Sequence, residues 1–255
     1  MKTRVALVGC CGRMGRAVRE LAAETGDIEL AAGVEVPGHP ELGTSCGSGM
    51  VTDSLAVALK RADVAVDFAL AEGAAGRIRE TAATGRAWVG GVTGLDDAAL
   101  AELERAAGLV PTVLAANFSL GVGVLCELAG RARELLGPEF DVEVVETHHR
   151  LKQDAPSGTA SELVRRLAGD SVCHGREGRV GVKPRGEVGV HAVRTGDVVG
   201  DHLVVFGGPG ERLELVHRAT SRSAFAAGAL AAARFAHGRA PGRYSMADVI
   251  AAFRD

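Results

Sequence analysis

Residues 4–15 read RVALVGCCGRMG, and this stretch decides the fold. Residues 4–8 have the apolar character of a buried strand. Gly9, Gly12 and Gly15 follow as a glycine-rich turn, which permits positive φ and lets the backbone approach a pyrophosphate closely. The first glycine is shifted by one position from the usual G-x-G-x-x-G spacing. In this context we favour a dinucleotide-binding turn over a tight turn that binds nothing.

The residues after this turn complete a βαβ unit. Residues 16–25 have helical apolar spacing, and residues 28–35 form a second strand that ends in Glu35. A carboxylate at this distance from the glycines can accept hydrogen bonds from the adenosine ribose. It would also repel a 2′-phosphate unless a cation intervened, which Val36 cannot supply and Arg13 could. We therefore predict NADH or NADPH as the cofactor, with a preference for NADH.

The alternation of strands and helices continues to about residue 115, which favours a parallel, doubly wound sheet. The expected strands are 64–68, 87–90 and 109–115, and the expected helices are 55–62, 74–84 and 96–107.

Near Asn117 the pattern changes to one that is richer in strands, which indicates a second domain of α+β type. We expect a helix at 122–136, a strand at 141–147, a helix at about 159–168 and a long loop at 170–189. Strands at 188–194, 203–206 and 212–217 follow, the last two joined by a hairpin at 207–210. Residues 224–238 and 246–253 return to helix.

The densest polar motif lies at residues 146–160, ETHHRLKQDAPSGTA. His148 and His149 are adjacent at the end of a strand, so their side chains point to opposite faces and cannot do the same job. Arg150 and Lys152 follow within three residues. Four desolvated cations would repel each other without acidic partners. Glu146 and Asp154 offset part of this charge, and a bound dianion would offset the rest.

The same motif ends in a predicted helix entry. Thr159 and Glu162 have the spacing of a capping box, and Pro156 suits the residues before it. Free N–H groups at a helix N-terminus bind anions. We therefore expect the N–H groups of Gly158 and Thr159, with the threonine hydroxyl, to hold a carboxylate. The motif as a whole predicts a site for a small dicarboxylate.

Composition excludes several other classes of protein. A net charge of −3 over 255 residues gives no basic surface for nucleic acid or an anionic membrane. No apolar run approaches the ~20 residues that span a bilayer. The cysteine count is odd, and no CxxC or Cys/His spacing suggests a metal site. We expect reduced thiols in a cytoplasmic protein without metal.

The chain resembles the 4-hydroxy-tetrahydrodipicolinate reductase (dihydrodipicolinate reductase) family, a group of nicotinamide-dependent enzymes of lysine biosynthesis. The resemblance covers essentially the whole chain, and the string from His148 to Ala160 is its most specific part. Further matching segments are residues 9–15, 66–68, 91–94, 115–122 and 194–202.

The resemblance implies a fold and an assembly. It implies a Rossmann-like dinucleotide-binding domain at residues 1–118 and 225–255. Residues 119–224 would form a substrate-binding and oligomerisation domain with a mixed four-stranded sheet, in a homotetramer. The C-terminal helices would pack on the first domain.

The resemblance also implies roles for individual residues. His148 matches the proposed proton donor, Lys152 a second donor or a carboxylate ligand, and His149 a substrate contact, while Gly158 and Thr159 match the carboxylate cradle. Cofactor contacts are implied at Gly9, Cys10, Cys11, Gly12, Arg13, Met14, Glu35, Gly91, Val92, Thr93, Ala115, Ala116, Asn117 and Phe118. Val92 departs from the threonine that the family often has there, so one hydroxyl contact is missing.

The implied reaction is loss of water from a cyclic hydroxy-dicarboxylate with uptake of a hydride and a proton. A histidine suits the proton donor because its ordinary pKa lies near neutrality. A lysine would need burial or neighbouring cations for this role. We expect His148 to act as general acid, with Lys152 as electrostatic clamp and second candidate donor.

Two other interpretations remain open from the sequence. The first is a different Rossmann oxidoreductase that uses Cys126 or Cys173 as a nucleophile. The second is an NAD-sensing regulator without enzymatic activity, although no basic nucleic-acid-binding element is visible.

Overall fold

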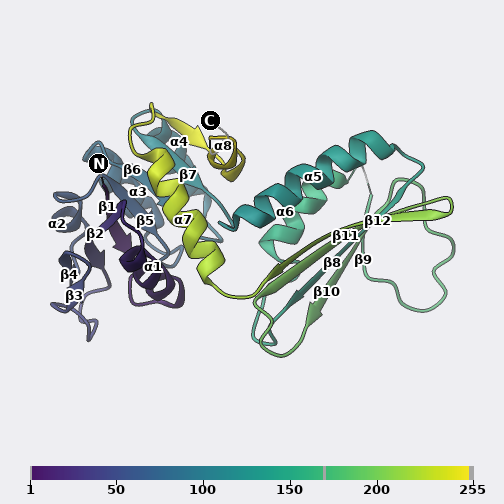
Figure 1. Cartoon of the computed structure of the whole chain (residues 1–255), viewed down its shortest axis with the longest axis horizontal. Helices are drawn as coiled ribbons and strands as arrows, with labels where there is room; N and C mark the ends of the chain where they lie inside the picture. Colours follow the sequence, from purple (N-terminus) through teal and green to yellow (C-terminus); the bar gives the residue numbers. More distant parts are fainter. Residues whose placement is uncertain (1, 169–170, 253–255) are drawn as a thin grey trace. The chain divides into compact units, whose positions relative to one another are not determined.

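The computed structural model describes residues 2–168 and 171–252, and the chain divides into two compact units (Figure 1). Unit 1 comprises Met1–Leu120 with Arg222–Asp255, and unit 2 comprises Gly121–Ser221. The boundaries expected from sequence, after residues 118 and 224, lie within a few residues of these. Residue 170 of the expected loop and residue 253 of the expected last helix lie outside the described residues.

Unit 1 contains an eight-stranded sheet in the order β13-β7-β6-β5-β1-β2-β4-β3. Every pairing is parallel except that of β3 with β4. The order of a doubly wound sheet is therefore confirmed. The strands are β1 (Thr3–Val8), β2 (Ile28–Val34), β3 (Ser45–Cys46), β4 (Gly49–Thr52), β5 (Val64–Asp67), β6 (Ala87–Gly90), β7 (Pro111–Leu114) and β13 (Gly242–Tyr244).

Helices cover both faces of this sheet, because its central strands are apolar on both sides. One face packs against α1 (Arg13–Glu24), α7 (Ser223–Ala236) and α8 (Met246–Ala251). The other packs against α2 (Leu55–Leu59), α3 (Ala74–Ala83) and α4 (Asp97–Ala107). The C-terminal helices α7 and α8 thus pack in the core of unit 1.

The glycine turn after β1 needs its glycines for two different reasons. Gly9 has φ +72°, a conformation that side chains rarely adopt. A Cβ on Gly15 would lie 2.1 Å from the Gly9 carbonyl oxygen, so only glycine lets α1 pack this closely on the turn. Gly12 is the residue that precedes the first turn of α1, which begins at Arg13 and not at the expected Arg16.

Unit 2 is a mixed sheet with two helices on one face. The strands are β8 (Asp141–His148), β9 (Val172–His174), β10 (Val188–Arg194), β11 (Gly200–Gly208) and β12 (Glu211–Ala219). They lie in the order β12-β11-β8-β10-β9. Apolar side chains of β8, β10 and β11 pack under α5 (Leu120–Leu136) and α6 (Gly158–Leu167). No helix in the described residues is long and apolar enough to cross a membrane.

The α/β class is confirmed, with two differences in detail. The second sheet has five strands instead of the expected four, because β9 forms within the segment expected to be a loop. This strand is short and lies at the sheet edge, where a three-residue pairing leaves no periodicity to detect. The short strands β3, β4 and β13 were also not expected from the sequence.

Candidate active site

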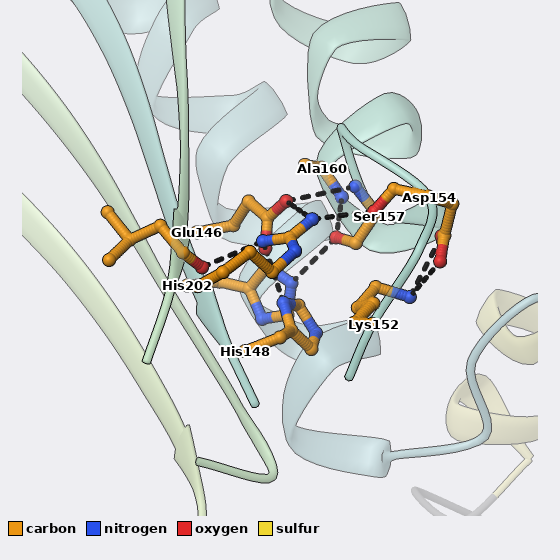
Figure 2. A network of polar contacts seen from close by, with 9 residues as sticks. Glu146, His148, Lys152, Asp154, Ser157, Ala160 and His202 are labelled. Carbon is orange, nitrogen blue, oxygen red and sulfur yellow. Dashed lines mark hydrogen bonds and ion pairs between the residues drawn. The ribbon is translucent and has the colours of Figure 1, made fainter. Parts of the chain in front are cut away.

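Strand register in unit 2 brings a polar cluster to one end of the helix-covered face. Glu146 and His148 lie on the same face of β8 as the core residues Val142 and Val144. On β11, His202 lies directly opposite Glu146. On β10, Arg194 pairs with His148 in the register. Figure 2 shows the side chains of Glu146, His148 and His202 converging with Ser157, at the start of α6.

Glu146 is the centre of this cluster and is completely buried. Its Oε2 accepts a hydrogen bond from Nδ1 of His148, and its Oε1 accepts one from the Ser157 N–H at 3.1 Å. Arg194 donates to both oxygens, at 3.0 and 2.9 Å. Burial acts to raise the pKa of Glu146, but the hydrogen bonds from Arg194 and His148 outweigh it and lower the pKa. Glu146 is therefore ionised.

His148 is 9 % exposed and sits between opposing influences. Burial lowers its pKa below the ordinary value, the bond to Glu146 partly offsets this, and the charges of Lys152 and Arg194 lower the pKa further. The imidazole is thus neutral at rest near pH 7, with its Nδ1 proton donated to Glu146. Nε2 remains for exchange with a ligand, and it lies beside Gly200, where a Cβ would be 3.0 Å away.

His202 contacts the N-cap residue of α6, Ser157. Its Nε2 shares a hydrogen bond of 3.3 Å with Oγ of Ser157. Burial and the neighbouring charge of His148 lower the pKa of His202 to about 4, so this ring stays neutral. Its edge also lies against the His148 ring, with 5.3 Å between the ring centroids.

Helix α6 begins two residues earlier than the expected capping box implies. Ser157 is its N-cap and accepts a hydrogen bond from the Ala160 N–H at 3.2 Å. Thr159 is therefore inside the first turn, where it is buried, and Gly158 is the exposed first residue of the helix. The first turn has no acidic residue, so its N–H groups suit an anion.

The remaining predicted residues lie in the loop between β8 and α6. Nζ of Lys152 lies 2.8 Å from both carboxylate oxygens of Asp154. His149 follows the last residue of β8 and is half-buried, and its Nδ1 has no hydrogen-bond partner within the described residues. Together, a helix N-terminus, a lysine and two histidines can bind an anionic ligand and exchange a proton with it.

The segments expected to bind the cofactor lie along one edge of the sheet in unit 1. Residues 9–14 follow β1, Glu35 follows β2, residues 91–93 follow β6 and residues 115–118 follow β7. These strands are neighbours in a parallel sheet, so their carboxyl ends share one edge. Ligands of open α/β sheets bind at this edge.

Local geometry at that edge fits a dinucleotide. The N-terminus of α1 has no side-chain cap and no acidic residue in its first turn, which leaves it suited to a pyrophosphate. Glu35 Oε1 accepts a hydrogen bond of 2.7 Å from the Cys11 N–H, so the carboxylate is held against the glycine turn. Phe68 and Phe118 meet edge to face at 5.7 Å over Gly91, where a Cβ would collide with Phe68.

Two cysteines, Cys10 and Cys11, lie in the glycine turn, and Cys46 of β3 lies near Cys10. Cys10 and Cys46 are buried, and Sγ of Cys10 lies 3.6 Å from Sγ of Cys11. Cys10, Cys11 and Glu35 form one group with metal-ligand spacing, and Cys11, His39 and Glu41 form a second. Because Arg16 and Arg19 both contact Glu41, permanent positive charge already faces this cluster. That charge disfavours a bound cation, and we assign no metal there.

The cysteines proposed as alternative nucleophiles are placed differently. Cys126 lies on the buried face of α5, where burial raises its pKa to about 11. Cys173 lies in β9, and its Sγ lies 3.0 Å from the Gly175 carbonyl oxygen. Neither cysteine is among the residues that contact the Glu146 cluster. This argues against a thiol-dependent dehydrogenase.

Sequence reasoning gave no role to three residues that complete the site: Arg194, Ser157 and His202. Arg194 and His202 lie more than 40 positions from Glu146 in each case, and only strand register brings them together. The usable signal was alternation, because Arg194 and His202 share the inward parity of Val190 and Val204 on their strands.

Comparison with known proteins agrees with this architecture. Residues 3–118 match the family model described as "Dihydrodipicolinate reductase, N-terminus", and residues 121–250 match "Dihydrodipicolinate reductase, C-terminus". The chain is 45 % identical to the 4-hydroxy-tetrahydrodipicolinate reductase of Alkalilimnicola ehrlichii, covering 98 % of this chain and 99 % of that protein. It is 44 % identical to the Myxococcus xanthus protein of the same name, with 97 % of each covered.

A solved structure has the same fold. It is the dipicolinate-bound dihydrodipicolinate reductase of a Paenisporosarcina species, with a TM-score of 0.79 and 24 % sequence identity. The match covers 96 % of this chain and 98 % of that one. Since both halves match the family models in order and the relatives match end to end, this chain belongs to the dihydrodipicolinate reductase family.

Proposed function

We propose that this chain catalyses the reduction of 4-hydroxy-tetrahydrodipicolinate to tetrahydrodipicolinate in lysine (diaminopimelate) biosynthesis. The overall change consumes a reduced nicotinamide and a proton and releases water. The observation that carries the proposal is the buried Glu146–His148 pair beside the anion-binding start of α6, in a chain of this family. Unit 1 would act as the dinucleotide-binding domain and unit 2 as the domain for substrate binding and oligomerisation.

The substrate class follows from the charges at the site. Gly158 and Thr159 begin α6, and their N–H groups would hold one carboxylate. Lys152 and His149 would contact the second carboxylate. The Paenisporosarcina relative is described with dipicolinate bound, which supports a dicarboxylate as the ligand of this family.

His148 would supply the proton as general acid. Burial lowers its pKa below the ordinary value, so the ring is neutral near pH 7. A dianion bound nearby favours the charged imidazolium and raises the pKa toward the working pH. Nε2 would then carry the proton, because Nδ1 is held by Glu146. Lys152 would act as electrostatic clamp and remains the second candidate donor.

The cofactor would be held by the turn after β1 and by the ends of β2, β6 and β7. The contacting residues would be Gly9, Cys10, Cys11, Gly12, Arg13, Met14, Glu35, Gly91, Val92, Thr93, Ala115, Ala116, Asn117 and Phe118. When bound, the reduced nicotinamide supplies the hydride. The glycine turn brings backbone N–H groups to the pyrophosphate, and Glu35 would accept hydrogen bonds from the adenosine ribose.

We propose a preference for NADH over NADPH. Glu35 is fixed against the glycine turn by the Cys11 N–H, so a 2′-phosphate would meet its charge. Arg16 and Arg19, two of the cations near this turn, are engaged by Glu41. We expect Glu35→Gln to narrow the preference by raising kcat/KM for NADPH. A wild-type kcat/KM for NADPH at least tenfold above that for NADH, about 1.4 kcal/mol, would refute the preference.

Assembly and location complete the proposal. We propose a homotetramer formed through the face of the unit 2 sheet that α5 and α6 leave uncovered. Val145, Val193, Leu203, Val205 and Val216 have the outward parity on this face. Light scattering on the purified protein measures the mass directly, and a monomer would contradict the assembly. All five cysteines are unpaired, which supports a reducing, cytoplasmic location.

The decisive experiment is a spectrophotometric assay. Pyruvate and aspartate semialdehyde are condensed in situ by the preceding synthase, and oxidation of NADH or NADPH is followed with and without this chain. Condensation-dependent oxidation supports the proposal. Cofactor binding without turnover would favour the regulator or a different dicarboxylate substrate.

A further inference from the structure

We propose that Glu146 is the positioning residue of this site, because one buried carboxylate fixes both the His148 imidazole and the turn that starts α6. This inference rests on the proposed function and deepens it. It assigns the common support of the proton donor and the carboxylate cradle to a residue that touches neither substrate nor cofactor.

The two carboxylate oxygens of Glu146 accept hydrogen bonds from two different parts of the site. Oε2 holds Nδ1 of His148, and Oε1 holds the Ser157 N–H at 3.1 Å (Figure 2). A carboxylate only accepts hydrogen bonds when ionised, so Nδ1 must carry the proton and Nε2 must face the ligand. Glu146 thereby selects the tautomer of His148 as well as its orientation.

The same carboxylate fixes the position of the helix N-terminus. Its bond to the Ser157 N–H places the N-cap, and the Ser157 hydroxyl is held separately by His202. Gly158 and Thr159 follow directly. A movement of Glu146 would therefore displace the proton donor and the anion-binding N–H groups together.

Arg194 makes this arrangement compatible with burial. Its two terminal nitrogens contact the two oxygens of Glu146, and one of them also donates to the Asp154 carbonyl at 2.6 Å. An unpaired carboxylate in this position would be strongly destabilising. Pairing cancels most of its charge, so His148 is oriented by Glu146 without being held permanently protonated.

The groups that face His148 come from four segments, and they predict opposite effects of two substitutions. Glu146 on β8 raises the pKa of His148. Arg194 from β10 and Lys152 from the loop are positive and lower this pKa. The neutral ring of His202 from β11 lies against His148. Glu146→Gln should therefore lower the pKa of His148. Arg194→Gln leaves Glu146 unneutralised and should raise it.

The chain supplies a matched control on the same strand. Glu143 lies in β8 and also contacts a histidine and cations, namely His191, Lys183 and Arg176. It has the outward parity, away from His148. Glu143→Gln thus removes a similarly engaged carboxylate from β8 without touching the proposed site.

The test compares wild type, Glu146→Gln, Arg194→Gln and Glu143→Gln. Nitrogen-15 NMR of labelled histidine reads the tautomer and pKa of His148, with His148→Gln used to assign its signals. We expect the Nδ1–H tautomer in the wild type and in Glu143→Gln, and its loss in Glu146→Gln. We expect the His148 pKa to move down in Glu146→Gln and up in Arg194→Gln.

Kinetics and binding give the second readout. In Glu146→Gln we expect kcat to fall at least about tenfold, its alkaline limb to move to lower pH, and pyridine-2,6-dicarboxylate to bind more weakly. An unchanged tautomer and pH profile in folded Glu146→Gln would overturn the inference. Shifts of the same sign in both variants would also overturn it. Absence of turnover in the wild type would instead count against the proposed function, because the NMR and binding measurements do not need turnover.

Discussion

Lys152 is held by Asp154, with Nζ 2.8 Å from each carboxylate oxygen. The lysine side chain is 20 % exposed, whereas that of Asp154 is 61 % exposed. An exposed carboxylate holds a cation weakly, because water competes for both partners. Asp154 therefore holds Lys152 within the site. A substrate carboxylate can readily displace Asp154 from this pair.

This pairing predicts different effects for the two partners. Lys152→Met should raise KM for the dicarboxylate and also lower kcat, because the charge acts on bound substrate and on the developing negative charge. Asp154→Asn should change KM by less than about threefold, or under 1 kcal/mol, the usual range of an exposed pair. Steady-state kinetics at fixed cofactor measures both. Equal losses in the two variants would mean that the pair serves the loop structure instead.

His148→Gln should separate proton donation from binding. A glutamine can keep one hydrogen bond to Glu146 but cannot supply a proton near neutral pH. We expect kcat to fall by about 10²–10⁴-fold, the usual contribution of a general acid, with KM little changed. If kcat persists while Lys152→Met abolishes it, Lys152 is the donor. Circular dichroism of each variant checks that the fold is intact.

Gly200 should be needed for access to His148. A Cβ at this position would lie 3.0 Å from Nε2, the atom that Glu146 leaves for chemistry. Gly200→Ala is therefore expected to lower kcat by about tenfold or more, since small displacements of a reacting group are costly. Gly207→Ala is the matched control, because it lies on the same strand and its Cβ would meet nothing within 4 Å. Similar losses in both would attribute the effect to the strand and not to Nε2.

Sequence periodicity was sufficient for the framework of both units. The main parallel strands of unit 1 are buried apolar runs separated by helices, and this alternation predicted a parallel, doubly wound sheet. Short elements such as β9 and β13 were not predictable, because three residues carry no period and their pairing depends on a neighbour already in place.

Part of the candidate site was likewise predictable from the sequence, and part was not. Residues 146–160 are local in sequence, so their polar density was visible without a structure. The contacts of Glu146 with Arg194 and of Ser157 with His202 depend on the register of β8 with β10 and β11, which sequence alone does not specify. The N-cap of α6 was misplaced by two residues for a related reason. Ser157 and Thr159 can both cap a helix, and tertiary contacts of Ser157 with Glu146 and His202 favour Ser157.

His202 should make the protein sensitive to mild acid. Its ring is 2 % exposed and its pKa is lowered to about 4 by burial, from an ordinary value of 6.5. The unfolded chain therefore takes up this proton at a higher pH than the folded chain does. Stability from the neutral ring is complete above pH 6.5 and is lost as pH falls from there toward 4, by up to about 3 kcal/mol. His148 and His217 have lowered pKa values too and act in the same direction.

The contribution of His202 can be isolated by comparing how much the free energy of unfolding falls between two pH values in the wild type and in a variant. Urea unfolding of the wild type and of His202→Gln, each at pH 7 and pH 5, gives the loss of stability on acidification. Glutamine can keep the contact with Ser157 but does not titrate, so the variant should lose less stability between these pH values. His174→Gln, at an exposed histidine of β9, should behave as the wild type does. If His202→Gln retains the full acid loss, the sensitivity originates in other groups, such as the carboxylates paired with Arg194 and Lys152.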